Sequence, residues 1–176
     1  MPSITPDDLK ASIRNVPDFP KPGIQFKDIS PMLADARLFS GCIDQLVGSW
    51  KPGDIDIVAG IDARGFLFAS AVALRLQAGL VPVRKKGKLP YQTIEESYSL
   101  EYGTNTLAMH VDAIRPGQRV LLVDDVLATG GTAAATVQLI ERLGGSLSEV
   151  AFVIELGFLN GRGRLGNRKI RSVLSF

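Results

Sequence analysis

Residues 119–132 read Arg-Val-Leu-Leu-Val-Asp-Asp-Val-Leu-Ala-Thr-Gly-Gly-Thr and carry the strongest structural signal in the chain. Val120 to Val123 form an apolar run without alternation, which is typical of a strand buried on both faces of a parallel sheet. Asp124 and Asp125 follow where we expect that strand to end, which is the edge of an open α/β sheet where ligands bind. A loop of small residues, 128–132, then leads into a predicted helix.

The small-residue loop predicts an anion site. Gly130 and Gly131 let backbone amides approach a ligand closely, and Thr132 is placed to cap the helix that follows. Apolar residues at helical spacing from Ala133 to Leu143 indicate this helix, and Gly144-Gly145 predicts its end. A helix N-terminus with free amides binds phosphate readily, so we expect a phosphate here.

The two carboxylates narrow the kind of phosphate ligand. The chain contains no Gly-x-x-x-x-Gly-Lys sequence, so this loop is not a P-loop. Two acids beside a phosphate would repel it unless hydroxyls or a cation lie between them. Sugar hydroxyls or a magnesium ion meet this requirement. Asp124 and Asp125 can accept hydrogen bonds from vicinal hydroxyls while the loop holds a 5'-phosphate. The alternative is a pair of solvated acids before a flexible glycine turn.

The remaining pattern predicts an α/β fold, namely a doubly wound, mostly parallel sheet flanked by helices. Residues 17–31 contain four prolines, which exclude a helix and a central strand and predict a stiff loop. Residues 89–105 are polar and unpatterned, as is typical of a lid loop. The predicted helices cover 5–16, 35–50 and a segment ending at Leu76, and the other predicted strands cover 55–59, 80–83, 106–110, 150–154 and 170–174.

Cationic residues follow two of the predicted strands. Arg64 lies at a strand-to-helix turn, on the sheet edge where Asp124 is expected, and its guanidinium suits a pyrophosphate. The alternative is an arginine in solvent at a helix start. Arg84, Lys85 and Lys88 follow the next strand and are expected to neutralise a multiply charged ligand, whereas we expect Lys86 to be solvated.

Composition excludes several other classes of protein. The chain has 176 residues, 45% of them hydrophobic, which suits one globular domain over 1–176. A net charge of +2 is too small to argue for a nucleic-acid partner. One cysteine excludes an internal disulfide and fits a reducing compartment, and neither a secretory signal nor a membrane-length apolar run is present. We therefore expect a cytoplasmic protein. With His110 the single histidine, a His/Cys metal site cannot be built.

Residues 161–166 match the dinucleotide fingerprint Gly-x-Gly-x-x-Gly. We reject this interpretation because only ten residues follow, too few for the helix, strand and distal acid that the motif requires. The basic residues around it indicate a solvated turn, since no aromatic residues are interleaved as in an RNA-binding tail. These residues are Arg162, Arg164, Arg168, Lys169 and Arg171.

The segment Asp124 to Thr132 resembles the ribose-phosphate motif of the type I phosphoribosyltransferases, and it is most similar to the members that act on adenine. The resemblance covers nearly the whole chain. It implies a purine-salvage enzyme that transfers the phosphoribosyl group of 5-phosphoribosyl pyrophosphate (PRPP) to adenine, giving AMP and pyrophosphate. It also implies a homodimer, and a magnesium ion carried by PRPP near Asp124 and Asp125 without a direct protein ligand. The alternatives are a transferase using hypoxanthine, guanine or xanthine, and a non-catalytic regulator that senses PRPP.

The resemblance also implies roles for individual residues. An N-terminal hood, 1–34, would place Phe26 on adenine, whereas the alternative is that Phe26 only plugs the hood onto the core. The flexible lid, 84–105, would carry Glu101 as the group that handles the purine proton; otherwise Glu101 is an exposed loop acid. Many members have Arg where this chain has Lys27. The implied residues are Asp124, Asp125, Ala128, Thr129, Gly130, Gly131 and Thr132 for ribose phosphate; Asp62, Ala63, Arg64, Arg84, Lys85, Lys88 and Tyr102 for pyrophosphate; Gln25, Phe26, Lys27 and Val126 for adenine; and Glu101 for catalysis.

Overall fold

The computed structural model of the chain describes residues 3–99 and 103–176. The chain divides into two compact units, Met1–Gln45 and Leu46–Phe176. The predicted hood, 1–34, falls inside the first unit, and the single domain over 1–176 stays a prediction. The elements of the first unit are α1 (Pro6–Ser12), β1 (Arg14–Pro17), β2 (Gln25–Asp28), α2 (Ser30–Ala34) and most of α3 (Ala36–Val47).

The stretch expected to be a stiff loop contains a strand, so that prediction was wrong in part. β1 and β2 pair antiparallel, with Val16 opposite Phe26, and form a two-stranded sheet. Prolines are tolerated because such a sheet has only edge strands, and Pro17 is the last residue of β1. The first helix is also shorter than predicted, because the chain turns extended at Ile13.

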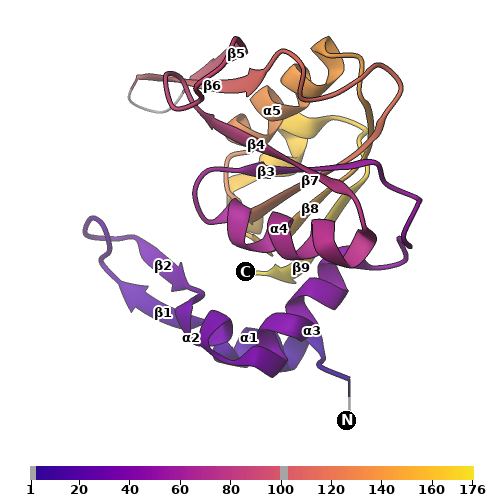
Figure 1. Cartoon of the computed structure of the whole chain (residues 1–176). Coiled ribbons are helices and arrows are strands. Elements are labelled where there is room, and N and C mark those ends of the chain that lie inside the picture. Colours follow the sequence, from indigo (N-terminus) through magenta and orange to yellow (C-terminus); the bar gives the residue numbers. More distant parts are fainter. Residues whose placement is uncertain (1–2, 100–102) are drawn as a thin grey trace. The chain divides into compact units, whose positions relative to one another are not determined.

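The second unit is built on a seven-stranded sheet with the order β5-β6-β4-β3-β7-β8-β9 (Figure 1). All neighbours from β4 to β9 in this order pair parallel, and the β5–β6 pair is added antiparallel at the β4 edge. This mixed, mainly parallel sheet confirms the predicted fold class. The strands are β3 (Ile57–Ile61), β4 (Gly79–Lys85), β5 (Thr93–Ser99), β6 (Thr104–His110), β7 (Arg119–Leu127), β8 (Ser146–Glu155) and β9 (Ile170–Ser175).

Two helices flank the sheet. α4 (Gly65–Leu76) packs on β3, β4 and β7, and Gly60 permits this approach because a Cβ there would lie 2.5 Å from that of Ala69. α5 (Gly131–Arg142) packs on β5, β6, β7 and β8. Successive strand residues face opposite sides, so Gly60 faces α4 whereas Ala59 and Ile61 face the other side. The helix end predicted at Gly144 is confirmed, since this residue follows the C-cap of α5 with a φ of 82°.

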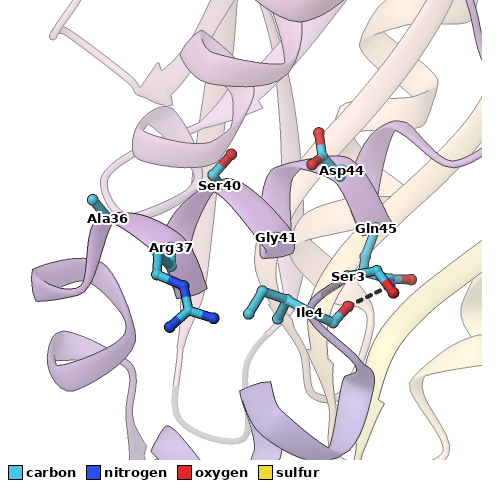
Figure 2. Close-up of a pocket in the computed structure, with 8 residues that line it drawn as sticks. All are labelled: Ser3, Ile4, Ala36, Arg37, Ser40, Gly41, Asp44 and Gln45. Carbon is cyan, nitrogen blue, oxygen red and sulfur yellow. Dashed lines mark hydrogen bonds between the residues drawn. The ribbon is translucent and has the colours of Figure 1, made fainter. Parts of the chain in front are cut away.

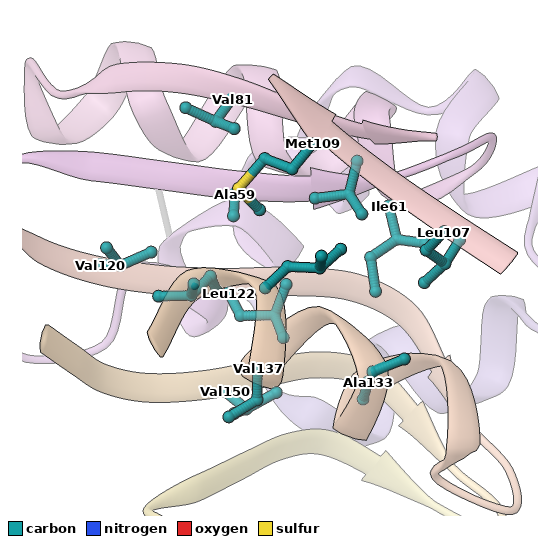
Figure 3. Close-up of a cluster of buried hydrophobic side chains, with 14 of the residues drawn as sticks. Ala59, Ile61, Val81, Leu107, Met109, Val120, Leu122, Ala133, Val137 and Val150 are labelled. Atoms are coloured by element: carbon teal, nitrogen blue, oxygen red, sulfur yellow. The ribbon is translucent and has the colours of Figure 1, made fainter. Parts of the chain in front are cut away.

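The main hydrophobic core lies between the sheet and α5. Figure 3 shows strand residues such as Ile61 and Leu122 meeting helix residues such as Val137. Leu122 is fully buried and Val137 is 1% exposed, so this layer excludes water behind the strand ends. The burial of these apolar side chains, at about 1.5–3 kcal/mol each, holds β7 and the start of α5 in place.

Two further predictions about strand limits were wrong. β7 runs to Leu127, so Asp124 and Asp125 lie within the strand and not after it. Residues 93–99 form β5, so the predicted lid, 84–105, is not an unstructured loop throughout. Each of the seven residues of β5 pairs with one of β6, which supplies the backbone hydrogen bonds that a polar edge strand needs.

Candidate ribose-phosphate site

The two carboxylates on β7 are buried. Asp124 is 8% exposed and Asp125 7%, and the backbone N–H of Asp125 donates to Oδ1 of Asp124 at 2.9 Å. The first turn of α4 lies against them, since a Cβ on Gly65 would come within 2.6 Å of Oδ1 of Asp124. Burial, and then the charge of Asp125, raise the pKa of Asp124 well above its usual range. Placing two acids here therefore carries a cost in stability.

Arg64 pairs with this acid pair. Its Nε lies 2.6 Å from Oδ2 of Asp125, as the predicted meeting of the two loops at one sheet edge requires. This contact is an ion pair without hydrogen-bond geometry. Oδ2 of Asp125 is buried and accepts no hydrogen bond from any residue within 3–99 or 103–176. A buried acceptor left in this state has capacity for a hydroxyl donor.

A small cavity lies at the start of α5. Its volume is about 70 Å³. Gly130 is the N-cap of α5 with a φ of 80° and provides no side-chain cap, so the amides of the first turn remain available to an anion. The cavity is lined by Asp124, Val126, Leu127, Ala128, Thr129, Gly130, Gly131, Thr132 and Ala133.

Thr132 does not cap α5, contrary to the prediction. It is the second residue of the helix, and its hydroxyl donates to the phenolic oxygen of Tyr98 at 3.0 Å. Tyr98 also lies over Gly131, because a Cβ there would be 3.0 Å from its ring. The predicted site did not include Tyr98, although it lies in the lid, 84–105, that the family resemblance implies.

The segment after β8 packs on the same loop. It contains two short 3₁₀ helices, η1 (Gly157–Leu159) and η2 (Gly161–Leu165), where a simple turn was predicted. The side chains of Arg162, Arg164 and Arg168 are exposed, as the predicted solvated turn requires. Gly161 and Leu165 are buried, and a Cβ on Gly161 would overlap the carbonyl oxygen of Ala128. A Cβ on Gly130 would likewise overlap the carbonyl oxygen of Gly161. The two glycines let the backbones touch, which fixes the loop from behind.

The residues predicted to hold pyrophosphate form a second group. Asp62 and Ala63 are joined by a cis peptide bond directly after β3. Arg84 donates from Nε to Oδ2 of Asp62 at 2.8 Å and from its guanidinium to the carbonyl oxygen of Lys88 at 3.0 Å. Lys85 and Lys88 are exposed. Arg84 therefore joins Asp62, in the loop after β3, to Lys88, in the basic segment 84–88.

The residues predicted to bind adenine lie in different units. Gln25, Phe26 and Lys27 lie on β2, where Phe26 packs edge to face with Phe19 at a centroid separation of 5.1 Å. Lys27 donates from Nζ to Asn15 at 3.1 Å. Val126 lies on β7 and lines the cavity. Two further predicted residues, Glu101 and Tyr102, lie outside the described residues.

A larger cavity, of about 460 Å³, lies within the first unit between the N-terminal segment and α3 (Figure 2). Ile4 lies against Gly41, where a Cβ would overlap its side chain, and the amide of Gln45 donates to the carbonyl oxygen of Ile4 at 3.3 Å. This cavity contains none of the predicted site residues.

Residues 3–99 and 103–176 show neither a cluster of metal ligands nor a membrane-spanning helix. We find no group of three or more His, Cys, Asp or Glu side chains able to hold a metal ion. Likewise, no helix in these ranges has the length and apolar character that crossing a membrane requires.

Comparison with known proteins identifies the family of this chain. Residues 25–166 match the family model described as the phosphoribosyl transferase domain. An adenine phosphoribosyltransferase from Acidothermus cellulolyticus is 56% identical over 166 residues, which cover 94% of each chain. One from Anaeromyxobacter dehalogenans is 55% identical over 97% of this chain and 99% of its own.

Solved structures show the same likeness. The adenine phosphoribosyltransferase of Rhodothermus marinus has a TM-score of 0.92 at 54% identity, covering 97% of this chain and 98% of its own. That of Saccharomyces cerevisiae, solved with an imino-altritol bisphosphate and adenine, has a TM-score of 0.90 at 40% identity. It covers 96% of this chain and 97% of its own.

Proposed function

Because this chain belongs to the phosphoribosyl transferase family, we propose that it transfers the phosphoribosyl group of PRPP to adenine. The products are AMP and pyrophosphate, which makes the protein a purine-salvage enzyme. The adenine specificity is supported by relatives at 50–56% identity that share the name adenine phosphoribosyltransferase.

The buried Oδ2 of Asp125 is the observation that carries the proposal. Its partner among the described residues is the guanidinium of Arg64, 2.6 Å away in an ion pair without hydrogen-bond geometry, so it can still accept from a hydroxyl. Asp124, its neighbour, lines the cavity at the start of α5. A ligand that joins hydroxyls to a phosphate satisfies both features. The hydroxyls of ribose donate to Asp124 and Asp125, and the 5'-phosphate accepts from the amides of the loop 128–132.

Pyrophosphate leaves from the anomeric carbon. The bond from that carbon to the pyrophosphate oxygen breaks as a ring nitrogen of adenine bonds to the carbon, through a cationic sugar as in glycosyl transfer. The exposed Lys85 and Lys88 and the guanidinium of Arg64 offset the charge that develops on the leaving group. Arg84 is already paired with Asp62, so its role is to position the two loops.

Adenine recognition follows the family resemblance. Phe26 stacks on the base, which is worth about 1–3 kcal/mol for an aromatic side chain and a base. Gln25 and Lys27 read its edge, and Val126 supplies an apolar contact. Glu101 exchanges the proton that the ring nitrogen loses, a role worth about 100- to 10,000-fold in rate.

Magnesium accompanies PRPP. The acid pair fits it, because two buried carboxylates accept hydrogen bonds from hydroxyls or from waters on the ion without a third ligand. Its chemistry is charge neutralisation on the pyrophosphate. From the family resemblance we also infer a homodimer, which sedimentation would test. A cytoplasmic location is supported by the single, buried Cys42.

Pyrophosphate release with each purine in turn tests the reaction. We expect turnover with adenine and magnesium, and at least about 100-fold lower kcat/KM with hypoxanthine, because its 6-oxo acceptor replaces an amino donor. Glu101→Gln is expected to lower kcat far more than it changes the affinity for adenine. Equal turnover of adenine and hypoxanthine would contradict the adenine specificity, and no release with any purine would contradict the reaction.

A further inference from the structure

Three arginines in residues 161–168 have different surroundings. Arg162 pairs with Glu155 at 2.7 Å, and Arg168 pairs with Glu141 at 2.7 Å. Arg164 is exposed and forms no hydrogen bond or ion pair with any residue of the described ranges 3–99 and 103–176. Its charge is therefore the one of the three without a partner among the described residues.

Arg164 lies beside the start of α5. A Cβ on Gly130 would lie 3.3 Å from the Cβ of Arg164, and a Cβ on Gly131 would lie 3.5 Å from a terminal nitrogen of its guanidinium. The close backbone contact between Gly130 and Gly161 fixes the segment that carries it. The guanidinium thus lies next to Gly131, the first residue of the helix, and Gly131 is one of the residues that line the 70 Å³ cavity.

The cavity needs a cation if it holds a phosphate monoester. Such a group carries a charge of about −1.5 to −2 near pH 7, while a helix N-terminus offers only about half a positive charge. None of the residues lining the cavity is Lys or Arg. The cation paired with the neighbouring acids is Arg64, and the proposed function uses its charge at the pyrophosphate and not at the 5'-phosphate.

We propose that Arg164 is a phosphate-binding residue, which adds a guanidinium to the amides that hold the 5'-phosphate of the ribose. This inference rests on the proposed function and assigns one further residue to that site. A guanidinium suits the task because its planar fork donates two parallel hydrogen bonds to phosphate oxygens. Arg164 adds binding energy at the phosphate and plays no part in bond breaking.

Calorimetry with AMP and adenosine on the full chain tests the assignment, because the two ligands differ only in the phosphate. We expect Arg164→Gln to weaken AMP binding about tenfold and to leave adenosine binding unchanged, as for the loss of a hydrogen bond to a charged group. Arg164→Lys, which keeps the charge without the fork, is expected to weaken AMP binding less. Arg168→Gln is the matched control, since it removes the same charge nearby and should leave both affinities unchanged.

The outcomes separate this inference from the proposed function. If the wild type prefers AMP to adenosine and Arg164→Gln binds AMP as tightly as the wild type, only the role of Arg164 is overturned. An equal loss for AMP and adenosine would also overturn it, because the effect would then be structural. Wild-type protein without preference for AMP over adenosine would contradict the phosphate site itself. If Arg164→Gln does not fold, Arg164→Met replaces it, and AMP affinity of Arg164→Met equal to wild type overturns the assignment.

Discussion

Gly161→Ala is expected to impair the phosphate loop although it changes no residue of the loop's motif. The new Cβ would lie 2.9 Å from a methyl carbon of Leu127 and 3.1 Å from the carbonyl carbon of Ala128, and it would overlap the carbonyl oxygen. Non-bonded carbons pack at about 3.5–4.0 Å, so η2 and the loop must separate by about 0.5 Å or more.

The magnitude has two parts. Overpacking of this kind costs about 1–3 kcal/mol, which lowers the Tm of a domain of this size by about 2–12 °C. Displacement of groups that position a substrate by about 1 Å can cost 100-fold in rate, so a shift of half that size should lower kcat/KM for PRPP about tenfold. Steady-state kinetics with varied PRPP and a thermal melt measure the two parts separately.

Gly163→Ala is the matched control on the same short helix. Its Cβ would lie 3.7 Å from the side-chain nitrogen of Asn160, which is ordinary van der Waals contact. We expect the kinetics and Tm of this variant to be close to those of the wild type. If Gly161→Ala keeps the wild-type kcat/KM for PRPP, or loses no more than Gly163→Ala, the contact of η2 with the loop does not shape the site and the reasoning is wrong.

Two more predictions concern buried charge. Because Asp124 has a raised pKa, its ionised form destabilises the folded state as the pH rises above the ordinary value of 3.8, and this cost is absent below it. Asp124→Asn should therefore raise the Tm at pH 7.5 by about 2 °C or more, and this gain should disappear near pH 4. The same variant should bind PRPP more weakly. A lower Tm at pH 7.5 would show that ionised Asp124 does not destabilise the fold. Glu149, 2% exposed, accepts from Trp50 at 2.6 Å and from Arg171 at 2.7 Å. Glu149→Gln should cost about 3–5 kcal/mol in urea unfolding, against less than about 1 kcal/mol for Glu141→Gln in an exposed pair, and equal losses would contradict the burial argument.

The central strand of the sheet and the helix that follows it were predictable because their signal is local. The apolar run before Asp124 and the periodicity after Thr132 lie in one short segment, and both β7 and α5 are present. The end of β7 was not predictable, because acids normally end a buried strand. Here they stay inside it, since the first turn of α4 approaches through Gly65, a contact between segments far apart in sequence.

β5 and η2 were missed for a related reason. The residues of β5 are polar and only partly buried, so they show neither alternation nor an apolar run, and their strand conformation depends on β6. Gly161 acts on Ala128 through a backbone contact that leaves no trace in the residue pattern. The side-chain hydrogen bond between Thr132 and Tyr98 was also unpredictable, because it joins segments that lie far apart in the sequence.

The contact between Gly130 and Gly161 also bears on the order in which the protein is made. On the ribosome, β7 and the first turn of α5 emerge well before η2, so the nascent chain contains the whole motif without the backbone that supports it. Ribosome-stalled chains of increasing length would then bind AMP only once Gly161 had left the exit tunnel. Ligand binding would report the completion of synthesis through this segment, and not merely the appearance of the motif.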